Sequence, residues 1–483
     1  MRHLRDGART LWFCISEDPA NYPLMLGLLL AVTIAFSTGA ALLSGISVVP
    51  IAFGGVCVLM MWHNLRDSHD ILDPRAGFFL GAFLFIALPD LIVATDFGRF
   101  GQLYRVQTIP QLVIERADFE RAQAIVAVGM LAVVSAFICA PAIGTPPGEE
   151  DEPRTNRNTW VIYSVAVSVA IAVAMIQYGT LANVLLSIVD PVSRISDVTH
   201  QESGLTGLLT LLTCVSAYYI IRRSGKRWLA IPLFIPPIAL TLPLANRGSL
   251  LEISLIASLA IGQLRFRRPF SVMVAGSLFL PPLAGGLLLL RNSALGFAGD
   301  VSLGGLYRGF ANESVAIPTL AFALEGIRSG LIRFTYGLDL LLFPVAFVPR
   351  LLWPGKPMPL DFRLNAALGL NDGTPFGTPV GIFGGFFLNF TWLAYVPAIF
   401  AFAIVLVWTA RRVRRDRLVL LLVFVFTIDI VRVGDISREL LTLSIGLMSV
   451  WLVRRLARPG EPTMRAVDNA GSIDVRKSAW PQV

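Results

Sequence analysis

The sequence predicts an all-α protein that crosses a membrane about twelve times. Of its 483 residues, 55% are hydrophobic and only 15% are charged, whereas soluble proteins carry about 25% charged residues. Apolar runs long enough to cross a bilayer recur from one end of the chain to the other. Clusters of Arg and Lys follow several of these runs, as is typical of cytoplasmic loops.

The predicted spans follow the apolar runs in order. The first, 22–43, is longer than the apolar core of a cleaved signal peptide, so we expect it to remain as a span. The others are expected at 46–64, 77–95, 122–142, 159–178, 204–221, 229–245, 247–264, 270–290, 380–409, 418–433 and 438–453.

Four basic runs orient these spans. They are "RRSGKR" (222–227), "RFRR" (265–268), "ARRVRRDR" (410–417) and "RRLAR" (454–458). Because basic residues accumulate on the cytoplasmic side, a cytoplasmic N-terminus followed by twelve spans places all four runs inside, together with the C-terminus. We therefore predict one transmembrane domain, 1–458, and a disordered cytoplasmic tail, 459–483.

The longest loop outside the cytoplasm is predicted at 291–379. It is too apolar for a free globular domain and too polar for a span, so we expect amphipathic helices and loops at the membrane surface. Within it, 339–352 is short, is interrupted by Pro344 and Pro349, and would place 410–417 outside if it spanned. We predict that 339–352 is a re-entrant or interfacial segment.

Charged residues collect at the boundary opposite the basic runs, where their cost makes them candidates for function. They are Arg247, Arg291, Arg308, Glu313, Arg350, Lys356, Arg432, Asp435 and Arg438. Arginines around one cavity suit a multiply charged anion, because the guanidinium fork binds phosphate oxygens in pairs. A lipid pyrophosphate is such an anion at a membrane surface.

Structural explanations remain open for some of these residues. Arg247 could anchor a helix at the interface, and Arg291 could complement a helix dipole. Arg432 could pair with Asp429 at the i,i+3 spacing.

No metal, cofactor or nucleic-acid site is predicted. The cysteines and histidines show no metal-ligand spacing. The net charge of +8 is explained by the basic runs. Two acids inside predicted spans, Asp90 and Glu252, could pair with neighbouring arginines.

Three stretches in the second half of the chain carry a family likeness. They are "ANRGSLLEI" (245–253), "YGLDLLLFPVAFVPRLLWPGKP" (336–357) and "GTPVGIFGGFFLNFTWLAYVPAIFAFAIV" (377–405). Together they resemble the bacterial oligosaccharide repeat unit polymerase family, of the O-antigen polymerase type. The Pro-Arg and Trp-Pro-x-Lys-Pro of the second stretch are the most specific feature. The first 200 residues are similar in hydropathy alone, and Gly355 stands where an acidic residue is common.

The resemblance implies a glycosyltransferase of the bacterial inner membrane, active at its periplasmic face in O-antigen or exopolysaccharide synthesis. A growing chain would pass from undecaprenyl pyrophosphate to the non-reducing end of the next lipid-linked repeat unit. The implied partners are this lipid-linked oligosaccharide, the bilayer and a chain-length regulator protein.

For this reaction we expect a cationic clamp on the departing pyrophosphate, because fixed cations stabilise charge as it develops. The clamp is predicted from Arg247, Arg291 and Arg350, with Lys356, Arg432 and Arg308 in support. Glu313 or Asp435 is expected to accept the proton of the acceptor hydroxyl. Arginines that neutralise the pyrophosphate make a metal unnecessary.

Three other classes remain open. A ligase would transfer finished chains from the same lipid to another acceptor. A flippase or other transporter would fit twelve spans, but charged or broken helices are then expected at the membrane midplane. A multi-span polyprenyl-phosphate-sugar transferase usually has acidic residues in its first outer loop, and the link at 44–46 has none.

Overall fold

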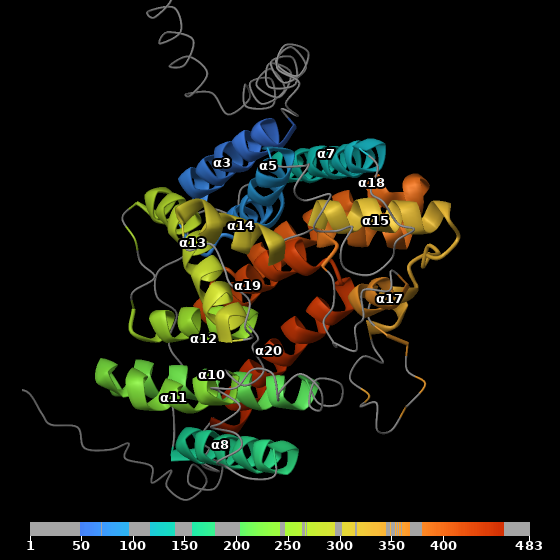
Figure 1. The fold of residues 1–483 in the computed structure, drawn as a ribbon. Coiled ribbons are helices and arrows are strands. Elements are labelled where there is room, and N and C mark those ends of the chain that lie inside the picture. The colour runs from blue at the N-terminus through green and yellow to red at the C-terminus, as the bar shows by residue number, and fades with distance from the viewer. Residues whose placement is uncertain are drawn as a thin grey trace, which may run out of the picture.

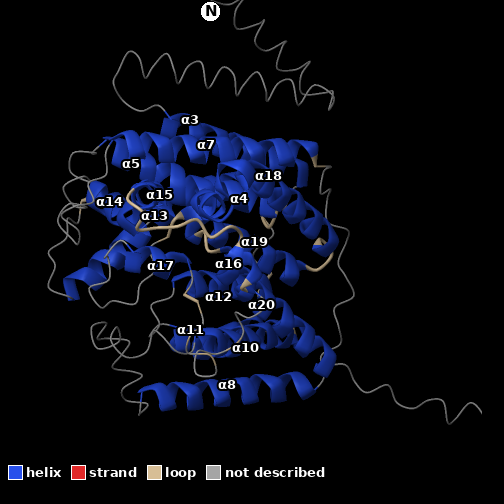
Figure 2. Ribbon diagram, turned by 90° about the vertical axis from the view of Figure 1, so that its right-hand side faces the viewer, coloured by secondary structure: helices blue, strands red, loops and turns tan. Residues whose placement is uncertain are grey.

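The structure, a computed structural model, is helical in the residues that it describes, and none of these residues forms a strand (Figure 2). The described residues are 49–68, 70–95, 116–140, 157–178, 203–241, 247–262, 266, 268–294, 302–313, 316–343, 348, 353, 355, 357–358, 360–367 and 379–457. The predicted all-α fold class is thus confirmed for this part of the chain.

The helices follow the predicted spans closely from the second span onward. In chain order they are α3 (Val49–Ser68), α4 (Pro74–Ala82), η2 (Phe83–Ala87), α5 (Leu88–Thr95), α7 (Arg116–Cys139), α8 (Arg157–Tyr178), α10 (Ser203–Ser224), η3 (Arg227–Leu229), α11 (Ala230–Thr241), α12 (Arg247–Ala260), α13 (Pro269–Ala294), α14 (Leu303–Glu313), α15 (Ala316–Arg328), α16 (Leu338–Leu341), α17 (Leu360–Ala367), α18 (Gly381–Val413), α19 (Arg417–Val433) and α20 (Ile436–Ala457) (Figure 1). The first predicted span, 22–43, lies outside the described residues.

Five helical segments among the described residues are long and apolar enough to cross a membrane. They are Pro74–Ile92, Ala117–Cys139, Pro269–Gly286, Gly381–Val413 and Ile436–Leu456. Length and hydropathy therefore indicate an all-α membrane protein. The total of twelve spans stays a prediction.

The core lies where α4 and α19 run side by side. A Cβ at Gly77 would stand 2.8 Å from the Phe424 ring, and one at Gly81 would stand 3.3 Å from the backbone of Ile428. These glycines allow the two helices to approach closely. Figure 1 shows α3 and α7 on one side of this centre and α8 on the other.

Three of the four basic runs meet at one end of the bundle, which we call the basic end (residues 222–227, 410–417 and 454–456). Arg454 at the end of α20 donates from Nε to Tyr219 Oη at 2.6 Å, and its Nη2 lies 2.6 Å from Asp416 Oδ2. Asn158 Nδ2 at the start of α8 donates to Leu456 O at 3.0 Å. Ends of helices that are distant in the sequence therefore share this face.

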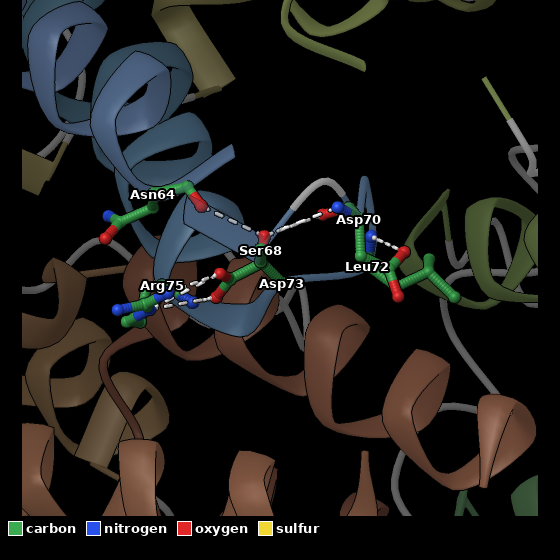
Figure 3. Close-up of polar contacts among 6 residues, drawn as sticks. All are labelled: Asn64, Ser68, Asp70, Leu72, Asp73 and Arg75. Carbon is green, nitrogen blue, oxygen red and sulfur yellow. Dashed lines mark hydrogen bonds and ion pairs between the residues drawn. The ribbon is translucent and has the colours of Figure 1, made fainter. Parts of the chain in front are cut away.

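The connection between α3 and α4 contains a network of polar contacts (Figure 3). Asp73 caps α4 by accepting from Arg75 N at 2.9 Å, and its Oδ2 also accepts from Arg75 Nη2 at 2.9 Å. Pro74 follows at the first helical position, where its missing N–H is not needed. Asp70 forms an ion pair with Arg417 at the start of α19. This network fixes the registry of α4 against α19.

The region 291–379 contributes partly to the bundle itself. Residues 316–323 of α15 are buried, and α15 packs against α7 and α18. This differs from the expected surface layer, because "AIPTLAFA" has no polar face to present to water. The predicted re-entrant segment 339–352 begins with the short α16, while 344–347 and 349–352 lie outside the described residues.

Candidate functional site

The start of α18 and the turn between α19 and α20 form the end of the bundle opposite the basic runs. Val380 N donates to Val433 O at 3.2 Å. Gly434 has φ +77°, and a Cβ there would stand 2.1 Å from Gly381 O. A Cβ at Gly385 would stand 1.9 Å from Gly434 O. Only glycines permit this contact, which fixes residues 380–385 and 432–439, here called the polar end.

Arg432 lies among three acidic side chains at the polar end. Its Nη2 is 3.3 Å from Asp429 Oδ1, so the ion pair considered as a structural alternative is present. Glu252 of α12 and Glu439 of α20 are buried, and both lie close enough to Asp429 for their charges to interact. Arg438 and Arg432 both act electrostatically on Glu439. We call Glu252, Asp429, Arg432 and Glu439 the Arg432 cluster.

The helix that carries Arg247 begins at the polar end. Arg247 is the first residue of α12 and precedes Glu252 by about 7.5 Å along the helix axis, at 1.5 Å per residue. The far end of α12 lies at the basic end, because Arg222 Nη1 is 4.0 Å from the position of a Cβ at Gly262. α12 therefore runs from the polar end to the basic end.

The helix that carries Arg308 and Glu313 also reaches Arg432, through two aromatic rings. The guanidinium carbon of Arg432 is 5.9 Å from the centre of the Phe85 ring. The Phe85 ring is 5.8 Å from that of Phe310 in α14. α14 thus approaches the polar end by its middle turns.

Arg291, another residue of the predicted clamp, lies in the final turn of α13. α13 packs on α14 so closely that a Cβ at Gly285 would stand 1.9 Å from Leu306 O. The side chains of Arg247, Arg291, Arg308 and Glu313, and the whole of Arg350 and Lys356, lie outside the described part of the structure. For the predicted clamp, the structure therefore places only the helices of Arg247, Arg291, Arg308 and Arg432, which are α12, α13, α14 and α19.

Asp435 is buried and caps α20. Its Oδ1 accepts from Ser437 Oγ at 2.8 Å and from Arg438 N at 3.0 Å, and its Oδ2 accepts from Leu360 N at 2.9 Å. The carboxylate therefore ties the start of α17 to the start of α20. Because both oxygens are engaged, this geometry suits a positioning residue better than a general base, and Glu313 stays the predicted base.

Asp435→Ala should lower the thermal stability of the purified protein more than Asp435→Asn does. Loss of a cap costs about 0.5–2 kcal/mol, and the buried N–H of Leu360 would also lose its acceptor. Asparagine is an equally good cap, but its single acceptor oxygen cannot serve both the start of α20 and Leu360 N. Thermal unfolding in detergent checks the order of the two variants. If the Asp435→Asn protein folds but does not extend chains, Asp435 rather than Glu313 would be the candidate general base.

Helix α18 is interrupted at Thr391, which has φ 58° and ψ −178°. This conformation costs a non-glycine residue about 1–3 kcal/mol. Next to the break, Leu388 O accepts from Thr335 N at 3.0 Å, and Asn389 O accepts from Gly337 N at 2.7 Å. The loop 335–337 thus supplies donors for carbonyls that a continuous helix would satisfy internally.

A second polar group surrounds this break. Thr335 Oγ1 lies 2.7 Å from Asn389 Oδ1 and 3.2 Å from Asp339 Oδ2. Asp339 is buried and forms an ion pair with Arg363 of α17. Burial raises the pKa of the Asp339 carboxyl above its usual value, and the Arg363 guanidinium opposes this shift. We call Thr335, Asp339, Arg363 and Asn389 the Asp339 cluster.

The two clusters are neighbours. Asp435 acts electrostatically on both Asp339 and Glu439. The same carboxylate accepts from Leu360 N, three residues before Arg363 in α17. The polar end therefore joins cations and carboxylates from α12, α16, α17, α19 and α20, with the amide of Asn389 from α18 beside them.

Sequence reasoning did not single out the Asp339 cluster. A signal was available, because Asp339 in "YGLDLLLF" and Asn389 in "FFLNFTW" are polar residues inside apolar runs. Asp90, expected beside an arginine, accepts two hydrogen bonds of 3.0 Å from Gln123 Nε2. Glu252, for which a neighbouring arginine was also considered, has the carboxylates of Asp429 and Glu439 as its charged neighbours.

The chemistry of the polar end favours a charged or polyhydroxylated ligand. Arg432 Nε and Arg363 Nε are buried and have no hydrogen-bond partner among the described residues. Each leaves a directional N–H donor for an oxygen-rich group. In the described ranges, no three His, Cys, Asp or Glu residues are arranged to hold a metal ion.

Comparisons with known proteins give no match. No protein-family model matches the chain, and searches of curated proteins and of solved structures find no similar protein.

Proposed function

We propose that this protein is a membrane glycosyltransferase that polymerises oligosaccharide repeat units carried on undecaprenyl pyrophosphate. In this proposal the chain crosses the bacterial inner membrane about twelve times, with both termini in the cytoplasm. The polar end then faces the periplasm. The resemblance of 245–405 to repeat unit polymerases is the starting point.

The observation that carries the proposal is the convergence of helices at the polar end. α12 begins there at Arg247, α14 reaches it beside Phe85, and Arg432 lies within it. The basic runs gather at the opposite end, as expected if that end faces the cytoplasm. The arginines predicted away from the cytoplasmic face, Arg247, Arg291 and Arg350, would need an anionic ligand, and a pyrophosphate anchored in the outer leaflet fits them.

In the proposed reaction, the bond between the anomeric carbon of the growing chain and its pyrophosphate oxygen breaks. The pyrophosphate leaves with the bonding electrons, held by Arg247, Arg291 and Arg350. The hydroxyl of the next repeat unit forms the new bond and gives its proton to Glu313. The charge of Arg432 is already shared with Asp429, so Arg432 has a supporting role.

A flippase for the same lipid-linked unit is the second candidate function. It is favoured by the interruption of α18 at Thr391 and by the buried charges of the Arg432 cluster, because transporters place their sites at broken helices. A ligase would use the same chemistry as the polymerase with a different acceptor.

One experiment separates these functions. Purified protein in vesicles is incubated with lipid-linked repeat units in the outer medium. A ladder of extended chains is expected. A single transfer to a foreign acceptor would indicate a ligase, and unchanged units moved across the vesicle wall would indicate a flippase. Either of these two results, without a ladder, would contradict the proposal.

Arg247→Lys should strongly slow chain extension although the charge is retained. Lysine loses the two-pronged geometry of the guanidinium group, and removal of one fixed donor from a developing anion costs about 10²–10³-fold in kcat. The matched control is Arg223→Lys, an exposed arginine at the basic end. Full activity of Arg247→Lys would remove Arg247 from the clamp.

A further inference from the structure

An aromatic surface surrounds the break in α18, beside the Asp339 cluster. The rings of Phe334 and Tyr336 are 6.2 Å apart, those of Phe334 and Phe387 are 5.7 Å apart, and those of Phe387 and Trp392 are 4.8 Å apart. Phe387 is buried, whereas Tyr336 is 77% exposed and Trp392 is 59% exposed. Two exposed rings are thus anchored on a buried one. We call these four residues the aromatic platform.

The backbone at and beside the aromatic platform has positive φ angles, which residues other than glycine rarely adopt. Tyr336 has φ 51°, and Thr391, directly before Trp392, has φ 58°. Strain of this kind persists where the surroundings impose it, and it is concentrated at ligand sites. Here the hydrogen bonds from Thr335 N and Gly337 N to the α18 carbonyls hold both exposed rings in place.

Hydrogen-bonding groups lie directly behind the platform. Thr335 and Gly337, the neighbours of Tyr336, contact Asn389, and Thr335 also contacts Asp339. Arg363 is partly exposed and pairs with Asp339, while its buried Nε has no partner among the described residues. The platform therefore combines ring faces with a carboxylate and a guanidinium group.

This combination fits one class of ligand. A sugar ring has an apolar C–H face that packs on an aromatic ring, and its rim of hydroxyls donates to carboxylates and accepts from guanidinium groups. A lipid tail would not use Asp339 and Arg363, and a pyrophosphate would not use the rings. Tyrosine and tryptophan supply such contact area with little loss of conformational entropy.

We infer that the aromatic platform and the Asp339 cluster bind a sugar of the acceptor oligosaccharide, with its ring against Tyr336 or Trp392 and its hydroxyls toward the partly exposed Arg363, which Asp339 holds in place. This inference rests on the proposed function, because it supplies the acceptor site of that reaction. It places the acceptor beside Asp435 and the Arg432 cluster, which share the polar end with it.

The test measures binding and turnover separately. The probe is the oligosaccharide repeat unit made by the cell that encodes this protein. It is released from its lipid by mild acid, so that it has no pyrophosphate. Calorimetric titration of the full-length protein in nanodiscs should show binding that Tyr336→Ala and Trp392→Ala each weaken about tenfold, which is near the upper value for one aromatic contact. In chain extension, both variants should raise the KM for the acceptor unit and leave kcat nearly unchanged.

Matched variants control for folding and for membrane anchoring. Trp408→Ala removes a ring that is 57% exposed on the same helix and should leave acceptor binding unchanged. Trp392→Phe retains a ring and should retain most of the affinity.

The outcomes separate the inference from the function. Chain extension with a wild-type KM in both alanine variants would overturn the platform and leave the polymerase standing. Ring-dependent binding of the free oligosaccharide without any chain extension would support the platform and contradict the polymerase. Absence of binding and of chain extension in the wild-type protein would overturn both.

Discussion

Gly385→Val should greatly reduce the yield of folded protein and abolish chain extension. The valine Cβ would stand 1.9 Å from Gly434 O, where contacts below 3.0 Å essentially never occur. Overpacking a core typically costs about 1–3 kcal/mol when side chains can adjust. Here the obstacle is backbone, so α18 must move away from the α19–α20 turn and take Arg432 and Asp435 out of register with α12 and α17.

Gly434→Ala should have the same effect for two reasons. Its Cβ would stand 2.1 Å from Gly381 O, and its φ of +77° is unfavourable for alanine. The control is Gly55→Ala in α3, where a Cβ meets nothing within 4 Å. That substitution should be neutral or slightly stabilising, because alanine favours a helix by up to about 1 kcal/mol relative to glycine. Gel filtration and thermal unfolding in detergent measure both effects. A Gly385→Val protein with wild-type stability would show that the polar end is not fixed by these glycines.

The sequence predicts the helices well because hydropathy is a local property. The predicted span 159–178 matches α8 to within two residues, and 418–433 matches α19 to within one residue. Arg432 and Asp435 could also be found, because charges next to apolar runs are visible without any knowledge of packing. The ion pair of Arg432 with Asp429 follows from their spacing alone.

The interruption of α18 could not be predicted in the same way. "FFLNFTWLAY" reads as a continuous apolar helix, and Thr391 leaves helical geometry where Thr335 and Gly337 supply donors from more than 50 residues away. The pair of Asp339 with Arg363 likewise depends on how α16 and α17 fold back. The polar residues themselves are visible in the sequence, but the break and the pairing arise from tertiary contacts, which local sequence patterns do not reveal.

The polar end joins two kinds of chemistry that a polymerase needs side by side. In the proposed reaction, Arg432 and Arg247 at the start of α12 would hold the departing anion, and the Asp339 cluster would offer hydrogen bonds beside exposed rings. Asp435 links the helices of both clusters, since it accepts from Leu360 N at the start of α17, which carries Arg363, and caps α20, which carries Glu439. A shift of this one carboxylate should therefore change donor and acceptor geometry together.

Arg432→Gln should destabilise the protein, because it leaves three carboxylates of the Arg432 cluster with one fewer cation. Asp429 is only 17% exposed and Arg432 is 30% exposed. The loss is expected between about 1 kcal/mol, as for exposed pairs, and about 3–5 kcal/mol, as for broken buried pairs. The control is Arg223→Gln, which replaces an exposed arginine at the basic end, and it should change the melting temperature little.

A second substitution separates stability from function. Asp429→Asn combined with Arg432→Gln should restore most of the lost stability, because one of the crowded carboxylates is then neutral. The double variant should still extend chains slowly if Arg432 supports the departing pyrophosphate, since that contact is not restored. A double variant as unstable as Arg432→Gln alone would contradict the electrostatic account of the cluster. A stable double variant with full chain extension would confine Arg432 to structure and leave the pyrophosphate to Arg247, Arg291 and Arg350.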